Sequence, residues 1–224
     1  FCLNRLLNIM VQIIERYNKI EKEAKYLSAK KVTIVAITKS FSLNFIKPLI
    51  DIGHLHFGEN KVQETFNKWS ETISKNLNIQ LHMVGKLQSN KASEAVNLFS
   101  YIHSLDNEKL AFRLFEKEKE YGKKLKYFIQ INIGNEYQKS GISKMHATDF
   151  IYFCINELKL NIVGLMCIPP INVDPSNYFN QLKQLASKEK LSELSMGMSN
   201  DYKIAIQSGS TFIRIGSAIF GKRD

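Results

Sequence analysis

Val32-Thr33-Ile34-Val35-Ala36-Ile37, followed directly by Thr38-Lys39-Ser40, is the stretch of sequence on which the prediction of the fold depends. The run is rich in β-branched residues and lacks polar alternation, which is typical of a strand buried on both faces of a parallel sheet. Over residues 3–29, apolar side chains recur at three- and four-residue steps, which predicts an amphipathic helix. The abrupt change of period therefore indicates a helix followed by a buried parallel strand.

The same alternation continues to the end of the sequence. Further strand-like runs, separated by helical patterns, cover residues 54–57, 80–84, 101–105, 126–133, 161–168, 194–198 and 212–215. Alternating strands and helices predict βαβ units in a parallel sheet, and eight such strands close a barrel. We therefore predict an α/β fold: a single (β/α)8 TIM-type barrel domain over residues 1–224, with an extra N-terminal helix, residues 1–30, packed on the barrel.

A doubly wound open sheet is the alternative architecture. That fold normally carries a G-x-G-x-x-G turn after its first strand, whereas this sequence has Thr38-Lys39-Ser40 there. Too few residues follow the last predicted strand for an ordinary eighth helix. We expect the N-terminal helix to take that place, which favours the barrel.

The charge and cysteine content narrow the possible partners. The 224 residues carry a net charge of +10, but the lysines are scattered rather than gathered in blocks. Without zinc-finger spacing or an RNA-binding aromatic motif, we predict no specific nucleic-acid partner. The three cysteines form no C-x-x-C pair, and no apolar run approaches the ~18 residues that span a bilayer. We therefore expect a cytoplasmic monomer without membrane association.

Two polar residues follow the first two predicted strands, and barrels of this type carry their chemistry at the C-terminal ends of strands. Lys39 follows the first strand, where partial desolvation favours the neutral amine that attacks a carbonyl group. A lysine that simply extends from a strand end into solvent would explain the position equally. Asn60 follows the second strand, where it could face the barrel mouth or cap the next helix.

The loops after the last two predicted strands have the features of a phosphate site. Ser199 follows the seventh strand. Arg214 lies in the eighth strand, and Gly216-Ser217 follows directly after that strand. Small residues with exposed backbone N–H groups and hydroxyls suit a phosphate, although an ordinary cap would explain either loop alone. A lysine amine and a phosphate site together specify a ligand with an aldehyde and a phosphate. Pyridoxal 5'-phosphate (PLP) fits, with Arg214 placed to face its pyridine nitrogen.

Histidines on three neighbouring predicted strands offer a competing interpretation. His54, His56, His82 and His103 together suggest a metal-dependent hydrolase. Such barrels usually place a carboxylate at the end of the last strand, where this sequence has Arg214, and a cation is a poor neighbour for a metal. We therefore predict no metal site and interpret the histidines as barrel-lining or core residues.

A set of motifs along the chain points to one family. The motifs are AITK at 36–39, FGENKVQE at 57–64, VGKLQSNK at 84–91, HSLD at 103–106, KSG at 139–141, GLM at 164–166, LSMGMS at 194–199 and RIGSAIFG at 214–221. In their order and spacing the chain resembles the pyridoxal phosphate homeostasis proteins, the YggS/PROSC family. The barrel of that family is similar to the N-terminal domain of alanine racemase.

The resemblance implies a fold and a set of binding residues. It implies the barrel domain alone of the PLP proteins of fold type III. It further implies that Lys39 forms the Schiff base with PLP, that Ser199, Gly216 and Ser217 bind the phosphate, and that Arg214 lies near the ring nitrogen. Asn60 is expected to contact the ring.

The expected function is to hold PLP without catalytic turnover in intracellular PLP homeostasis, with PLP-dependent apo-enzymes as candidate recipients. The alternative is a PLP-dependent amino-acid racemase of the same fold. Such racemases take a second acid or base from an appended β domain and a partner subunit. Because the sequence ends at Asp224, shortly after the last predicted strand, we expect that domain to be absent.

Overall fold

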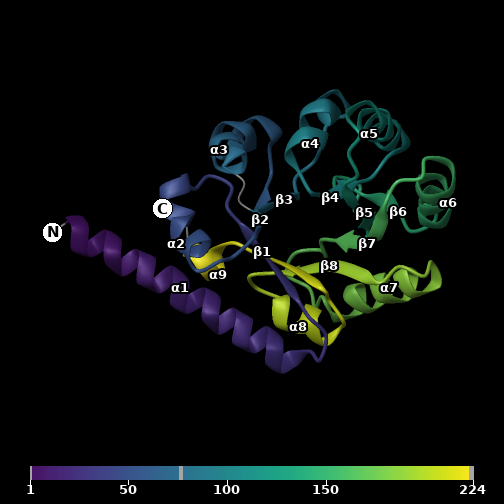
Figure 1. Cartoon of the computed structure of the whole chain (residues 1–224). Coiled ribbons are helices and arrows are strands. Elements are labelled where there is room, and N and C mark those ends of the chain that lie inside the picture. The colour runs from purple at the N-terminus through teal and green to yellow at the C-terminus, as the bar shows by residue number, and fades with distance from the viewer. Residues whose placement is uncertain (1, 76–77, 222–224) are drawn as a thin grey trace.

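The strands of the computed structural model form a closed ring, with helices packed around it (Figure 1). The structure describes residues 2–75 and 78–221, so the predicted domain boundaries, residues 1 and 224, lie outside the described residues. The strands are β1 (Thr33–Ile37), β2 (His56–Glu59), β3 (Gln80–Met83), β4 (Tyr101–Leu105), β5 (Lys126–Asn132), β6 (Ile142–Ser143), β7 (Ile162–Cys167), β8 (Glu193–Met198) and β9 (Phe212–Ile215).

The ring is parallel throughout. Its order is β4-β3-β2-β1-β9-β8-β7-β5, and β4 pairs with β5 to close it. The predicted (β/α)8 barrel is therefore confirmed, and an open doubly wound sheet is ruled out. The short strand β6 lies outside the ring and extends the edge of β5, where Ile131 pairs with both Cys167 and Ile142. A strand of two residues is too short to leave a periodicity in the sequence.

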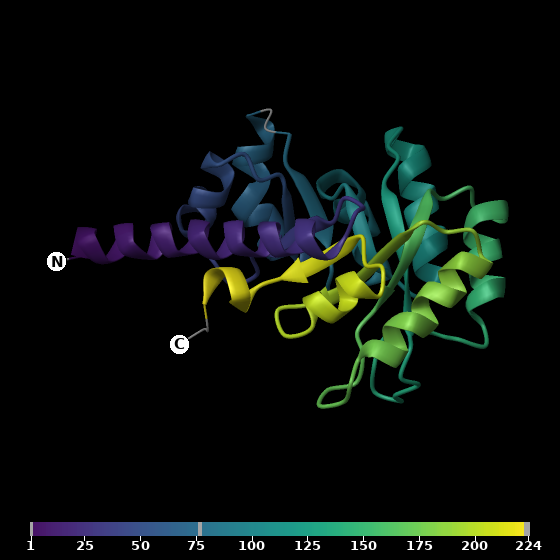
Figure 2. The same ribbon diagram turned by 90° about the horizontal axis from the view of Figure 1, so that it is seen from below.

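Helices alternate with the strands and cover the outside of the barrel. They are α1 (Cys2–Leu27), α2 (Leu43–Asp51), α3 (Val62–Ser74), α4 (Ala92–Leu98), α5 (Glu108–Tyr121), α6 (Ala147–Tyr152), α7 (Ser176–Lys188), α8 (Tyr202–Gln207) and α9 (Ser217–Phe220). Within the described part of the chain, the single turn of α9 is all that follows β9, and the long helix α1 lies against α2, α8 and α9 (Figures 1 and 2). Among the described residues, no helix is long and apolar enough to cross a bilayer.

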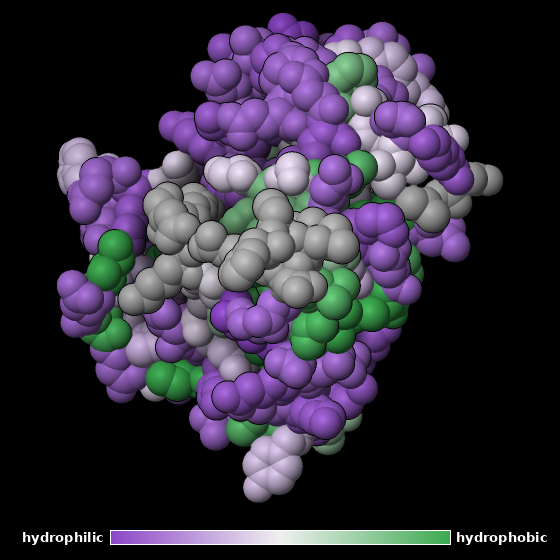
Figure 3. All heavy atoms as spheres, turned by 90° about the vertical axis from the view of Figure 1, so that its left-hand side faces the viewer, coloured by the Kyte–Doolittle hydropathy of each residue, from purple (hydrophilic) through white to green (hydrophobic). Residues whose placement is uncertain are grey.

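Two apolar cores hold these layers together. One lies between the strands and the helices, and the other fills the inside of the barrel with Val35, Ile37, Tyr101, Phe128, Met166 and Phe212. On the outer surface, the face that shows the N-terminal end of α1 is largely hydrophilic, with hydrophobic side chains gathered in small groups (Figure 3).

The second strand begins later than the sequence pattern predicts. Its predicted start, His54, instead belongs to the turn that ends α2, where its backbone N–H donates to the Leu49 carbonyl at 2.9 Å. Gly53 makes this turn possible, because its φ of 83° lies in the left-handed region that glycine adopts without strain. The strand therefore starts at His56.

The four histidines considered for a metal site line the barrel or its base. His82 and His103 are fully buried, His54 is 7% exposed, and His56 is half-buried. Their interpretation as barrel-lining or core residues is confirmed. Burial lowers the pKa of His54 to about 4 and, together with the charges of Lys31 and Lys126, that of His56 to about 4. Burial also lowers the pKa of His82 and of His103 well below its ordinary value.

These lowered values predict that acid destabilises the protein. Below about pH 6.5 the unfolded chain binds protons at these histidines, whereas the folded protein keeps them neutral until about pH 4. The unfolded state therefore binds more protons in this window, and the free energy of unfolding should fall as the pH is lowered through it. Urea midpoints measured from pH 7 to pH 4 check this.

The matched control is His146→Gln, because that side chain is exposed. This variant should follow the same curve as the wild type. A midpoint that stays constant between pH 6.5 and 4.5 would contradict the depressed values.

Candidate functional site

A cavity of about 930 Å³ opens at the C-terminal ends of the barrel strands. Its walls bring together Lys39 from the loop after β1, Ser199 from the loop after β8, and Arg214, Gly216 and Ser217 from β9 and the turn that follows. Five of the six predicted site residues thus lie in one cavity although they come from three separate parts of the chain. Its apolar wall includes Ile37, Phe41, Ile168, Pro169 and Met198.

The Lys39 loop is fixed from behind by a buried carboxylate. Glu59 of β2 is 1% exposed, and its Oε1 accepts hydrogen bonds from Thr38 Oγ1 at 2.6 Å, Lys68 Nζ at 2.8 Å and Trp69 Nε1 at 3.0 Å. Lys68 Nζ also donates to the Thr38 carbonyl at 2.8 Å. A buried charge is stable only when it is paired and fully hydrogen-bonded. This network therefore holds the residue next to Lys39 at a set position.

The loops after β8 and β9 are joined by one hydroxyl. Ser199 Oγ accepts hydrogen bonds from the backbone N–H of Gly216 at 3.3 Å and from that of Ala218 at 3.1 Å. The backbone N–H groups of the β9 loop therefore point toward Ser199 in the cavity, and Ser217 lies exposed beside them. Converging N–H and O–H groups of this kind suit an anion with several acceptor oxygens.

Gly197 allows the Ser199 loop to lie close to the barrel. Its φ is 94°, and a Cβ there would come within 2.5 Å of the Ala205 Cβ and 3.0 Å of the Tyr202 Cα. Both contacts are closer than carbon atoms tolerate, so only glycine fits between β8 and α8 at this point. The motif LSMGMS is thus explained by backbone geometry as well as by its terminal serine.

Arg214 lies at the floor of the cavity and is 4% exposed. Its Nη1 donates to the Ser195 carbonyl at 2.7 Å and to Ser195 Oγ at 2.8 Å, and its Nη2 donates to the Cys167 carbonyl at 2.9 Å. Burial lowers its pKa, but a guanidinium keeps its proton at any working pH. Of its five N–H groups, two remain beyond these three bonds to described residues.

Asn60 lies apart from the other predicted site residues. It lines a neighbouring cavity of about 340 Å³, whose wall shares Lys139 and Ile168 with the larger one. A Cβ on Gly85 would come within 2.4 Å of the Asn60 carbonyl oxygen, so Gly85 brings the loop after β3 directly against the Asn60 backbone. The structure therefore places Asn60 beside the main cavity rather than in its wall.

The residues that support the site were not predicted from the sequence. Glu59 lies within the motif FGENKVQE, and its position directly after Phe57-Gly58 in a buried strand was the available signal that its carboxylate would be buried. Among the described residues, no group of three or more histidine, cysteine, aspartate or glutamate side chains is arranged to hold a metal ion.

Comparison with known proteins identifies the family. Residues 13–224 match the family model described as alanine racemase, N-terminal domain. A pyridoxal phosphate homeostasis protein of Pasteurella multocida is 38% identical over 203 residues, which cover 86% of this chain and 87% of the relative. One of Haemophilus influenzae is 35% identical over 228 residues, covering 97% and 94%. The chain belongs to the pyridoxal phosphate homeostasis protein family.

Solved structures agree with this assignment. PipY of Synechococcus elongatus, determined with PLP bound, has a TM-score of 0.83 and 31% identity, covering 93% of this chain and 100% of PipY. Alanine racemase of Clostridium difficile has a TM-score of 0.72 at 12% identity and covers 90% of this chain but 55% of the racemase. The likeness to the racemase shows the fold alone, so the family barrel is shared with an enzyme of greater length.

Proposed function

We propose that the chain binds PLP in the cavity of about 930 Å³ at the C-terminal ends of the strands, where Lys39 holds it as a Schiff base. We further propose that the chain serves PLP homeostasis in the cytoplasm as a carrier without catalytic turnover. Apo-enzymes that require PLP are the recipients that we propose. The observation that carries the proposal is the convergence, in one cavity of about 930 Å³, of a lysine amine with the N–H and O–H groups of two loops. The family membership and the PLP-bound PipY support it.

The donor groups of the cavity fit the two ends of PLP. When bound, PLP supplies an aldehyde that an amine captures reversibly. Lys39 Nζ would form the C=N bond as one water leaves, while Ser199, Gly216 and Ser217 would bind the phosphate through hydroxyls and backbone N–H groups. Arg214 has N–H groups left for the pyridine nitrogen. We further propose that Asn60 contacts the edge of the pyridine ring from the neighbouring cavity.

The other ionisable groups on the cavity wall support holding rather than turnover. Lys139 Nζ pairs with Glu136 at 2.5 Å and donates to the Pro169 carbonyl at 3.1 Å. Asp201 Oδ1 accepts the backbone N–H of Met198 at 2.6 Å. These groups are engaged with the protein, whereas racemisation needs a second acid or base that is poised on the substrate.

The charge of Arg214 suits the same conclusion, although the resemblance implies that racemases of this fold tolerate an arginine there, so this charge does not by itself separate the two candidate functions. A permanent cation beside the pyridine nitrogen disfavours protonation of that nitrogen. An unprotonated ring withdraws electrons from the bound carbon less strongly, and this suits storage of the cofactor.

The proposal as a whole is tested by a titration and an assay. Adding PLP to the purified protein should give a saturable visible absorption band, and L-alanine should racemise far below the enzyme median of ~10 s⁻¹. No saturable band would refute the binding proposal. Racemisation near the median would refute the absence of turnover and favour the racemase alternative.

We predict that Arg214→Gln weakens PLP binding and shifts the visible band. Glutamine is preferred to glutamate in this test, because a carboxylate would face the Ser195 and Cys167 carbonyl oxygens that Arg214 now contacts. Loss of a charged hydrogen bond should lower PLP affinity by about 10- to 150-fold. Absorbance titration measures both effects, and an unchanged band with unchanged affinity would mean that Arg214 does not face the ring.

A further inference from the structure

A row of hydrogen-bonded imidazoles crosses the inside of the barrel and ends at Arg214. His56 Nδ1 lies 3.0 Å from His82 Nε2, and His82 Nδ1 lies 2.9 Å from His103 Nε2. His103 Nδ1 lies 2.8 Å from Ser195 Oγ, which in turn accepts from Arg214 Nη1 at 2.8 Å. We call the three histidines, from β2, β3 and β4, the imidazole row. It joins one side of the barrel to β8 and β9 on the other.

Arg214 sets the direction of every hydrogen bond in the row. A guanidinium only donates, so Ser195 Oγ accepts from it and has its own proton free to donate to His103 Nδ1. His103 must then carry its proton on Nε2 and donate to His82 Nδ1. By the same step His82 donates from Nε2 to His56 Nδ1. The row therefore consists of neutral Nε2–H tautomers.

The opposite direction would leave a buried proton without an acceptor. If His103 donated from Nδ1 to Ser195, the Ser195 hydroxyl would accept from both His103 and Arg214. Its own proton would then have no acceptor among the hydrogen bonds of the described residues, in a side chain that is fully buried. An unsatisfied buried hydroxyl is costly, so the direction set by Arg214 is the stable one.

Aromatic packing holds the imidazole row rigid. The His82 ring stacks on Tyr101 with centroids 4.3 Å apart and planes at 8°, and the His103 ring stacks on Phe128 at 4.4 Å and 24°. Burial, and for His103 the nearby charge of Arg214, keep the pKa of both rings well below its ordinary value. Both rings are therefore neutral and cannot turn freely.

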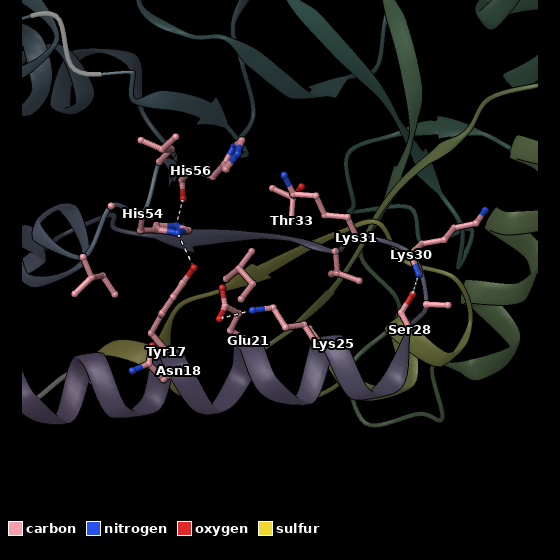
Figure 4. A pocket seen from close by; sticks show the side chains of 17 residues that line it. Tyr17, Asn18, Glu21, Lys25, Ser28, Lys30, Lys31, Thr33, His54 and His56 are labelled. Carbon is pink, nitrogen blue, oxygen red and sulfur yellow. Dashed lines mark hydrogen bonds and ion pairs between the residues drawn. The ribbon is translucent and has the colours of Figure 1, made fainter.

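His54 is a neighbour of the row but lies outside it. Its Nε2 donates to the backbone carbonyl of His56 at 2.7 Å, and its Nδ1 lies 3.0 Å from the Tyr17 hydroxyl (Figure 4). Figure 4 shows His54 between α1 and the start of β2, at a cavity on the N-terminal side of the barrel. His54 is thus also buried in the same region, but no bond from its ring reaches Ser195.

We propose that the imidazole row, acting through Ser195, positions Arg214 in the PLP site. By accepting the Ser195 proton, His103 keeps the lone pairs of that hydroxyl turned toward the guanidinium. The rest of the row supports this arrangement, because His82 Nδ1 accepts the proton that His103 carries on Nε2. The inference rests on the proposed function, because it concerns how Arg214 is presented to the cofactor. The tautomers themselves can be tested without PLP.

The first experiment is ¹⁵N NMR of the cofactor-free protein labelled at histidine. His56, His82 and His103 should each carry the proton on Nε2, with an unprotonated Nδ1. In Ser195→Ala the Nδ1 resonance of His103 should shift, because it no longer accepts a hydrogen bond, while its Nε2 stays protonated. A proton on His103 Nδ1 in the wild type, or an unmoved resonance in Ser195→Ala, would overturn the inference whatever PLP does.

The second experiment is a double-mutant cycle on PLP affinity and the visible spectrum. Ser195→Ala and His103→Phe should each weaken PLP binding on the order of 10-fold and shift the band. Because His103 acts through Ser195, the double variant should lose about 10-fold and not the ~100-fold of two independent effects. A fully additive cycle would overturn the inference. If His103→Phe fails to fold, the PLP affinity and the visible spectrum of Ser195→Ala provide the test by themselves.

The matched control is His54→Phe. It removes a buried histidine of the same region and its bond to Tyr17, so it should lower the urea midpoint while leaving PLP affinity and spectrum unchanged. A loss of affinity equal to that of His103→Phe would show a general effect of core damage and overturn the positioning role. Failure of the wild type to bind PLP would refute the proposed function and leave the NMR result to stand by itself.

Discussion

Replacing Lys39 with alanine should abolish covalent attachment of PLP altogether. Lys39 is the lysine that we assign to the Schiff base, and the loops that would bind the phosphate belong to β8 and β9, so they should remain intact in Lys39→Ala. The variant should therefore lose the visible band and all borohydride-stable label while still binding PLP weakly. Absorbance and the mass of the borohydride-treated protein measure the covalent part, and equilibrium dialysis measures the residual binding.

Lys86→Ala is the control for this substitution. Lys86 lies exposed after β3, in the wall of the neighbouring cavity, and its loss should leave the label in place. Persistence of covalent label in Lys39→Ala would contradict the assignment. Loss of label in both variants would indicate damage to the barrel mouth in general.

The second large effect should distinguish phosphate recognition from recognition of the ring. Ser199→Ala and Ser217→Ala should each weaken PLP binding by about 10- to 150-fold, the range for one hydrogen bond to a charged group. Binding of unphosphorylated pyridoxal should barely change. Because both hydroxyls would contact one phosphate, the effects should not simply add.

Ser217→Ala is the cleaner of the two variants. Ser199 Oγ also holds the backbone N–H groups of Gly216 and Ala218, so its loss frees the β9 loop as well, whereas Ser217 lies exposed at the cavity. The matched control is Ser192→Ala. Ser192 is exposed and directly precedes the start of β8, at the end of the strand away from the cavity, so this variant should bind both PLP and pyridoxal as the wild type does. Equal losses for PLP and pyridoxal would contradict a phosphate contact at these serines.

Much of the barrel was predictable because its strands are buried on both faces. The run 32–37 is almost entirely apolar, and 126–133 is apolar except at Lys126, Gln130 and Asn132. The helices between the strands are amphipathic, so the change of period marks each unit. Errors fell where a local turn overrides composition. Gly53 ends α2 and moves the start of the second strand from His54 to His56, and a strand as short as β6 has no period to detect.

The mouth of the site was also within reach of the sequence, because the barrel topology gathers the strand ends in one place. That rule alone predicts that Lys39, Ser199 and Gly216 lie close together, and all three do line one cavity in the structure. Asn60 falls in the neighbouring cavity because Gly85 brings the next loop against its backbone. That contact depends on loop packing, which strand periodicity does not describe.

The hydrogen-bond networks that support the site could not be predicted from the sequence, for a different reason. Glu59 and the imidazole row are polar groups inside an apolar core, and each is stable only through partners on other strands. His103 meets Ser195 across the barrel, 92 positions away in sequence. Burial and register must be known before such a partner can be named. The sequence therefore predicted that the histidines line the barrel or its core, but not that their rings hydrogen-bond to one another.

The central claim is that Lys39 holds PLP covalently, and one measurement tests it directly. The wild-type protein is saturated with PLP, reduced with borohydride and digested, and the labelled peptide is identified by mass spectrometry. We predict that the added mass lies on the peptide containing Lys39. A label found mainly on a peptide containing Lys91 or Lys139, or no label at all, would contradict the account.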